Sequence, residues 1–262
     1  MRSSYGSSDF QRILRSRYMR SLRAAIVFLT RIPVGVGRQG PPPLSQAVPW
    51  FPMVGTIVGC LVGVVYLLAS QALPAAVAAV VAIAFGIAIT GAFHLDGLAD
   101  SADAFAGGTT VERRFEILKD SRLGTYGTSA LVLVLFLEIA ALATLMPSTG
   151  LTALVTAHGI GRASAVGVMV LTRNTAKEGL GADYLADLSR IRGSVGISAA
   201  VGIALLLNGY DGFLLIAFAL PATLLTWAWS HRSIGGVVGD SLGAIAQLSQ
   251  TSVLVAASAL NS

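Results

Sequence analysis

The sequence contains few charges and almost no cysteine. Only 12% of its 262 residues are charged, and Cys60 is the single cysteine. A soluble domain carries about 25% charged residues, so the composition argues against a soluble protein. One cysteine excludes an intrachain disulfide. Because no basic residue lies near it in the sequence, we expect Cys60 to be a small buried hydrophobic residue and not a nucleophile. The three histidines show no zinc-ligand spacing.

Long apolar runs take the place of the missing charges. Hydrophobic residues make up 54% of the chain, and the mean hydropathy is +0.74. This composition predicts an all-α fold, a polytopic transmembrane helix bundle of about seven spans within a range of six to eight. The expected spans are 47–70, 73–93, 126–146, 151–171, 194–208, 212–230 and 242–260. The fifth of these is short for a span, so that helix either begins earlier, tilts or reaches only partway across the bilayer.

The basic residues gather on one side of these spans. If the spans alternate, segments 1–46, 94–125, 172–193 and 231–241 share a side and contain 8, 4, 4 and 1 lysines or arginines. The opposite turns contain none. The positive-inside rule therefore predicts that the N terminus and the basic segments face the cytoplasm.

The N-terminal region combines arginines with apolar residues at helical spacing over 10–29. This pattern predicts a basic amphipathic helix on an anionic membrane surface. A nucleic-acid-binding arm and a signal peptide fit less well, because the segment leads directly into membrane-like sequence and has no evident cleavage site. We divide the chain into a basic arm, 1–21, and a single membrane-embedded catalytic domain, 22–262.

Three aspartates follow the apolar run 73–93. Asp96, Asp100 and Asp103 stand at i, i+4 and i+7, which places them on one face of a helix, where they repel each other. A divalent cation removes this conflict, and Mg²⁺ suits a few carboxylates combined with substrate phosphates. The alternative is a solvated acidic helix end. Gly97 allows close approach of a phosphate or another helix. For His94 three roles are open: it orients Asp96, it transfers a proton, or it only caps the helix.

Two further segments suit a phosphate-bearing substrate. "RRFEILKDSRLGTYG" (113–127) is basic, and its alternative reading is an interfacial loop held by internal salt bridges. "HRSIGGVVGDSLGA" (231–244) is glycine-rich but lacks the Gly-Lys-Ser/Thr ending of a P-loop. Arg162, within a span, either serves function or pairs with Glu138 to hold the bundle together. The candidate phosphate-binding residues are Arg113, Arg114, Arg122, Gly124, Arg162, Gly236, Gly239 and Asp240.

These segments resemble the adenosylcobinamide-GDP ribazoletransferase (cobalamin synthase) family. The shared motifs are "FLTRIPV" (28–34), "WFPMVGTIVGCLVG" (50–63), "HLDGLADSADAFAGG" (94–108), "RRFEILKDSRLGTYG" (113–127), "GRASA" (161–165) and "GGVVGDSLGA" (235–244). The resemblance implies an inner-membrane, Mg²⁺-dependent enzyme with its site facing the cytoplasm. It would join adenosylcobinamide-GDP to α-ribazole or α-ribazole 5′-phosphate and release GMP. Adenosylcobalamin or its 5′-phosphate would be the product.

The resemblance also directs the site predictions. The catalytic candidates are His94, Asp96, Lys119 and Asp120, and the metal candidates are Asp96, Asp100 and Asp103. The expected partners are both substrates, membrane lipid, and a second copy of the chain or another enzyme of the pathway, with no nucleic acid. Gln247 and Gln250 stand where the family usually carries glutamates, so we leave both out of the metal site. The alternatives are a CDP-alcohol-type phosphotransferase, although Asp100 stands where its motif has arginine, and a transporter, although no inverted repeat is evident.

Overall fold

The computed structural model describes residues 7–35, 40–172 and 188–261, with side chains from residue 17 onward. Every regular element in these ranges is a helix. Six helical stretches are long and apolar enough to cross a membrane, and a bent helix pair brings the number to seven. The expected helix bundle is therefore confirmed. The six are Leu44–Ala69, which comprises α2 (Leu44–Ala47), η1 (Val48–Trp50) and α3 (Phe51–Ala69), then α7 (Thr125–Ala143), α8 (Pro147–Thr172), α10 (Arg190–Asn208), α11 (Asp211–Ile234) and α12 (Gly239–Leu260).

The bundle has two central helices and a ring of outer ones. Most of the α8 and α12 spans is buried, 78% and 72% respectively, whereas the corresponding fractions of α7, α10 and α11 are 22–28%. Polar side chains on α8 and α12 therefore lie inside protein, while the outer helices present apolar side chains to lipid. The fifth expected span does begin earlier than 194, at Arg190.

Glycines on α3 let it pack directly against α8. A Cβ atom on Gly55 would lie 2.5 Å from the His158 carbonyl oxygen, and one on Gly63 would lie 3.0 Å from the Leu151 Cα. Small residues commonly bring membrane helices together in this way. The same packing corrects the expectation for Cys60. Because the glycine face turns toward α8, Cys60 lies on the outward face of α3 and is exposed.

The second expected span, 73–93, is broken by a sharp bend. Helix α4 (Ala75–Thr90) has 16 residues, fewer than the ~20 a bilayer requires, and α5 (Phe93–Gly107) leaves it at 88°. Two consecutive residues in the left-handed region make the bend, Gly91 at φ 64° and Ala92 at φ 59°. This conformation strains an alanine. The N–H of Arg31 donates to the Ile89 carbonyl at 2.7 Å, so the segment after α1 supports the bend.

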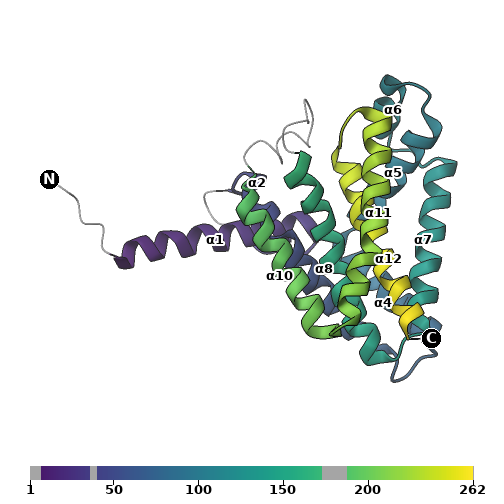
Figure 1. The fold of residues 1–262 in the computed structure, drawn as a ribbon, viewed down its shortest axis with the longest axis horizontal. Coiled ribbons are helices and arrows are strands. Elements are labelled where there is room, and N and C mark those ends of the chain that lie inside the picture. Colours follow the sequence, from purple (N-terminus) through teal and green to yellow (C-terminus); the bar gives the residue numbers. More distant parts are fainter. Residues whose placement is uncertain (1–6, 36–39, 173–187, 262) are drawn as a thin grey trace.

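The two ends of the bundle differ in what they carry. Figure 1 shows the connections at 70–74, 144–146 and 209–210 at one end, together with the C terminus. Helices α5 and α6 (Val111–Leu118) and the α11–α12 turn lie toward the other end.

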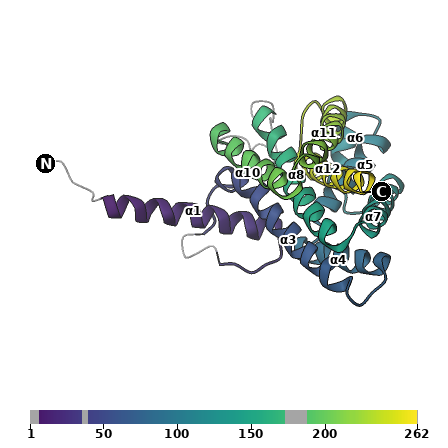
Figure 2. The same cartoon turned by 60° about the horizontal axis from the view of Figure 1, so that its bottom comes forward.

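Helix α1 (Ser7–Leu29) runs across the direction of the spans and projects from the bundle in both views (Figures 1 and 2). It is continuous through residue 21, where we placed the boundary of the basic arm. Its described portion exposes Tyr18 and Met19 beside Arg17. Apolar and basic groups side by side suit a helix that lies on a membrane surface.

Candidate active site at the crossing of α5 and α12

Helices α5 and α12 cross at a point where neither has a side chain. A Cβ atom on Gly97 would lie 2.8 Å from the Asp240 carbonyl oxygen and 3.3 Å from the Gly243 Cα. The expectation that Gly97 admits close approach is confirmed, and the neighbour is a helix. The crossing brings Asp240 beside the aspartates of α5.

Asp96, Asp100 and Asp240 form a group that we call the carboxylate cluster. Asp100 is repelled by Asp96, Asp240 and Asp103, and Asp240 is repelled by Asp96. Asp96 is exposed, while Asp100 and Asp240 are half-buried. None of the three forms an ion pair with any residue in the described ranges. Three acids that lie close together, with no lysine or arginine of the described ranges paired to them, fit a site that binds a cation from outside the chain.

The geometry of the cluster sets limits on how it can hold Mg²⁺. As the side chains stand, no three histidine, cysteine or acidic groups among the described residues converge enough to bind one ion. Mg²⁺ usually keeps several waters and needs only one or two carboxylates plus substrate phosphates. The unpaired carboxylates therefore fit this ion, with substrate oxygens completing its shell. Asp240, which the sequence placed with the phosphate-binding residues, stands with Asp96 and Asp100.

Asp103 points away from the cluster toward the first turn of α7. Its carboxylate accepts hydrogen bonds from the N–H groups of Gly124 at 2.7 Å and Gly127 at 2.9 Å. A Cβ atom on Gly124 would lie 2.5 Å from an Asp103 oxygen. Gly124 and Gly127 thus make room for a carboxylate that satisfies a helix N-terminus. A metal role for Asp103 and a phosphate role for Gly124 stay predictions.

The Asp103 carboxylate accepts hydrogen bonds from two N–H groups. Asp103→Asn is therefore expected to destabilise the substrate-free protein by about 1.5–3 kcal/mol. The asparagine amide would present its own N–H₂ group to one of these donors. Thermal unfolding in detergent measures the effect. Glu112→Gln, the same change at an exposed position in the first turn of α6, is the control. Equal melting temperatures for the two variants would contradict the capping role.

The basic segment around α6 is largely paired within itself. Arg113 contacts Glu116 at 2.7 Å, and Arg122 contacts Asp120 at 2.6 Å. Arg114 donates to the carbonyls of Gly108 at 3.0 Å and Ser233 at 2.7 Å, which joins α6 to the end of α11. The internal salt bridges considered for this loop are therefore present. Phosphate binding by these arginines stays a prediction and requires Arg113 and Arg122 to exchange a carboxylate for a phosphate.

Asp120 is poorly suited to accept a proton. Hydrogen bonds from the Arg122 side chain and backbone lower the pKa of Asp120 to about 2. A carboxylate with so low a pKa is a weak base at neutral pH. The neighbouring Lys119 side chain is exposed and forms no ion pair with a described residue, so it can turn toward an anion.

The glycine-rich turn before α12 leaves open space beside the cluster. A Cβ atom on Gly236 or Gly239 would meet nothing within 4 Å, and Gly235 adopts a left-handed φ of 75°. Ser230 donates to the Gly236 carbonyl at 2.7 Å, which fixes the turn. The N-terminus of a helix favours anions, but here Asp240 opposes them. A phosphate at this position therefore also needs a cation.

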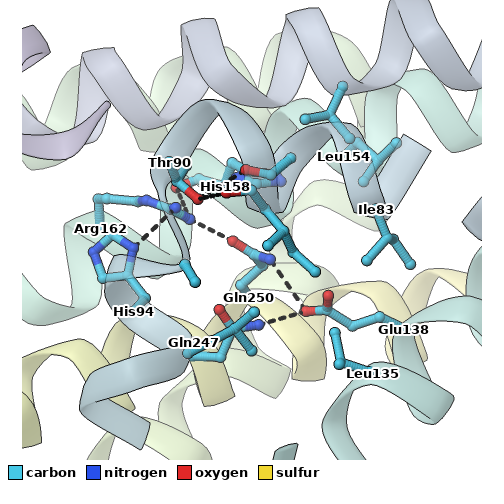
Figure 3. A pocket seen from close by; sticks show the side chains of 15 residues that line it. Ile83, Thr90, His94, Leu135, Glu138, Leu154, His158, Arg162, Gln247 and Gln250 are labelled. Carbon is cyan, nitrogen blue, oxygen red and sulfur yellow. Dashed lines mark hydrogen bonds between the residues drawn. The ribbon is translucent and has the colours of Figure 1, made fainter. Parts of the chain in front are cut away.

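Below the crossing, Arg162 belongs to a buried polar chain (Figure 3). It lies 3.1 Å from His94 Nδ1 and donates to the Gln250 amide oxygen, and the Gln250 amide nitrogen donates to Glu138 at 3.1 Å. The expected pairing of Arg162 with Glu138 is thus mediated by Gln250. Gln247 also donates to Glu138, at 2.9 Å.

The chain of hydrogen bonds is separate from the carboxylate cluster. Gln247 and Gln250 lie two to three turns after Asp240 along α12. The cavity that the chain lines has a volume of about 30 Å³, which admits one or two waters but no substrate. The structure therefore favours a bracing role for both glutamines.

Arg162 also determines what His94 can do. A guanidinium only donates, so Nδ1 of His94 must accept and the ring proton lies on Nε2. In this arrangement His94 is a hydrogen-bond donor and has no free nitrogen to take a proton. It is not a helix cap either, because Ala92 occupies the N-cap position of α5.

The Gln250 amide accepts from Arg162 and donates to Glu138 at once, so Gln250→Leu is expected to destabilise the protein by about 3 kcal/mol or more. The substitution leaves two charges buried without their shared partner. Thermal unfolding measures the loss, and Gln71→Leu, at an exposed turn, is the control. A melting temperature equal to that of the wild type would contradict the bracing role.

Comparisons with known proteins identify the relatives of this chain. A family model for cobalamin-5-phosphate synthase matches residues 21–258. An adenosylcobinamide-GDP ribazoletransferase of Shewanella frigidimarina is 37% identical over 237 residues, which cover 86% of this chain and 89% of the relative. The enzyme of the same name from Bradyrhizobium diazoefficiens is 38% identical, covering 91% and 93%. That from Klebsiella pneumoniae is 33% identical, covering 91% and 99%. No solved structure matches.

Proposed function

This chain belongs to the cobalamin-5-phosphate synthase family, and we propose that it joins adenosylcobinamide-GDP to ribazole at the α5–α12 crossing. It is a multi-pass membrane transferase of cobalamin biosynthesis. The observation that carries the location is the unpaired carboxylate cluster beside an open glycine turn. No other group of acids among the described side chains combines mutual repulsion with adjacent free space.

The reaction is a displacement at phosphorus. A ribose hydroxyl oxygen of ribazole forms a bond to the phosphorus that carries the cobinamide. The pyrophosphate bond to the second phosphorus breaks, and GMP leaves with the electron pair. The hydroxyl proton passes to a carboxylate or to water. Asp96 is the best-placed acceptor because it is exposed and lacks an ion-pair partner among the described residues.

The other residues bind and orient the substrates. The N–H groups at the start of α12 face the pyrophosphate across the open turn, and Lys119 approaches it from α6 as a mobile positive charge. His94 donates its Nε2 proton toward a substrate oxygen. Mg²⁺, held by one or two carboxylates of the cluster formed by Asp96, Asp100 and Asp240, would supply the charge that neutralises the pyrophosphate.

We place the crossing on the cytoplasmic side of a bacterial inner membrane. The basic segments 94–125 and 231–241 lie toward the same end of the bundle, which supports this orientation (Figure 1). Helix α1 then lies on the anionic inner surface. The lipid-facing helices leave surface for a second copy or another enzyme of the pathway.

Product formation by membranes that contain the protein tests this proposal. The membranes receive adenosylcobinamide-GDP and α-ribazole 5′-phosphate, with Mg²⁺ or with EDTA. We expect Mg²⁺-dependent release of GMP and an equal amount of adenosylcobalamin 5′-phosphate. Membranes from the same host without the protein are the control. Failure of folded protein to form product in Mg²⁺ would contradict the proposal, and product formation in EDTA would contradict its metal requirement.

A further inference from the structure

The aspartates of α5 follow directly on the bend between α4 and α5, so the bend decides where they lie. Asp96 stands a few residues after Ala92, about 6 Å along the helix at 1.5 Å per residue. A rotation of α5 by about 10° at the bend would therefore move Asp96 by about 1 Å and Asp100 by about 2 Å. Displacement of a reacting group by about 1 Å costs about a hundredfold in rate.

The two residues at the bend do not hold this angle by themselves. Gly91 at φ 64° and Ala92 at φ 59° both lie in the left-handed region. Glycine has many other conformations open to it, and an alanine adopts this one only where the surrounding structure holds it there. Contacts from outside the two helices must therefore stabilise the bend.

The segment at the end of α1 supplies such contacts. The N–H of Arg31 donates to the carbonyl of Ile89, one of the last four carbonyls of α4, which lack a partner inside the helix. The guanidinium of Arg31 lies beside Gly91, where a Cβ atom would be 3.1 Å from its Cζ and from its Nη2. A cation at this place suits the negative end of the α4 dipole. Arg31 forms no ion pair with a residue of the described ranges, so no carboxylate there draws it away from the helix end.

A ring contact ties the first residue of α5 to the same end of α1. Phe93 meets Phe28 edge-on with their centroids 5.1 Å apart, and Phe28 stacks on Phe51 of α3 at 5.4 Å. Phe28 thus connects the start of α5 to the bundle. The next two residues, Leu29 and Thr30, are only 3% and 5% exposed, which anchors the segment that reaches the bend.

We propose that Arg31 is a positioning residue of the reaction, because it fixes the α4–α5 bend and thereby sets Asp96 and Asp100 against Asp240. This assignment rests on the proposed function and adds to it a residue that acts through α5 and not on the substrates. The "FLTRIPV" segment (28–34), for which the reaction itself has no use, then serves the carboxylate cluster from a distance.

Arg31→Ala tests the assignment, because it removes the guanidinium and keeps the N–H group that binds Ile89. We expect kcat to fall about tenfold and the KM for adenosylcobinamide-GDP to change by less than about twofold, since Lys119 and the glycine-rich turn lie outside the bend. Arg31→Lys keeps a cation at the end of α4 and should recover most of the wild-type kcat. Arg17→Ala, at an exposed position on α1, is the matched control and should leave kcat unchanged.

The distance between two spin labels measures the bend without catalysis. The labels are attached after Val77→Cys on α4 and Ala106→Cys on α5, both at exposed positions, in a Cys60→Ala background. Residue 106 lies about 21 Å along α5 from the bend, so a rotation by about 10° would move it by about 4 Å. We expect Arg31→Ala to shift or broaden the distance distribution by about 2–4 Å, and the lysine variant and the control to leave it unchanged.

An unchanged label distance in Arg31→Ala would overturn the proposal, whether or not kcat falls. A wild-type kcat for this variant would overturn it as well. A lower melting temperature with neither effect would show that Arg31 only stabilises the fold, which also overturns the proposal. If the wild type forms no product, the proposed reaction fails, while the label distances still decide whether Arg31 sets the bend.

Discussion

The Asp96→Asn variant is expected to lose about a thousandfold or more in turnover while it inserts and folds normally. Asparagine has the same shape but removes the charge that a cation and a proton transfer both require. Removing one of three mutually repelling acids also relieves repulsion. The melting temperature without metal should therefore stay the same or rise.

Steady-state turnover and thermal unfolding of the purified variant measure these two effects. Asp211→Asn, at an exposed position in the first turn of α11, changes the same group far from the crossing. It should retain wild-type turnover. Near-normal turnover of folded Asp96→Asn would remove this carboxylate from the chemistry.

Turnover of the Gly97→Ala variant is expected to fall about a hundredfold, because moving the reacting groups apart by about 1 Å costs about that factor. The added methyl group would lie 2.8 Å from the Asp240 carbonyl oxygen, and this backbone atom cannot rotate away. Helices α5 and α12 must then separate, which moves Asp240 from Asp96 and Asp100. Overpacking should also lower stability by about 1–3 kcal/mol.

Gly202→Ala on α10 is the matched control, because a Cβ atom there meets nothing within 4 Å. Alanine favours a helix by about 1 kcal/mol over glycine, so this variant should be at least as stable as the wild type and fully active. Wild-type turnover by Gly97→Ala would show that the close crossing does not position the reacting groups.

Local patterns in the sequence predicted much of this fold. Hydropathy gave the spans, because a bilayer requires about 20 apolar residues per helix. Helical periodicity placed Asp96 and Asp100 on one face of α5. The bend before α5 was missed. Gly91 is a recognisable helix end, but nothing local shows that Ala92 also adopts a left-handed conformation.

The parts of the site that depend on long-range contacts could not be predicted. Asp240 joins the carboxylate cluster only because two glycines let α5 and α12 touch. Asp103 turns to the N-terminus of α7, although its spacing is as regular as that of its neighbours. Likewise, Gln250 links Arg162 to Glu138 across three helices, a contact that no sequence spacing encodes.

Asp100→Cys in a Cys60→Ala background tests the carboxylate cluster most directly. A thiolate prefers softer metals to Mg²⁺. Turnover of this variant is measured with Mg²⁺ alone and with added Cd²⁺, with Cys60→Ala as the reference. If the cluster holds the metal, Mg²⁺-supported turnover is lost and Cd²⁺ restores part of it, whereas the reference gains nothing from Cd²⁺. Undiminished Mg²⁺-supported turnover of the Asp100→Cys variant would contradict a reaction centred on these carboxylates.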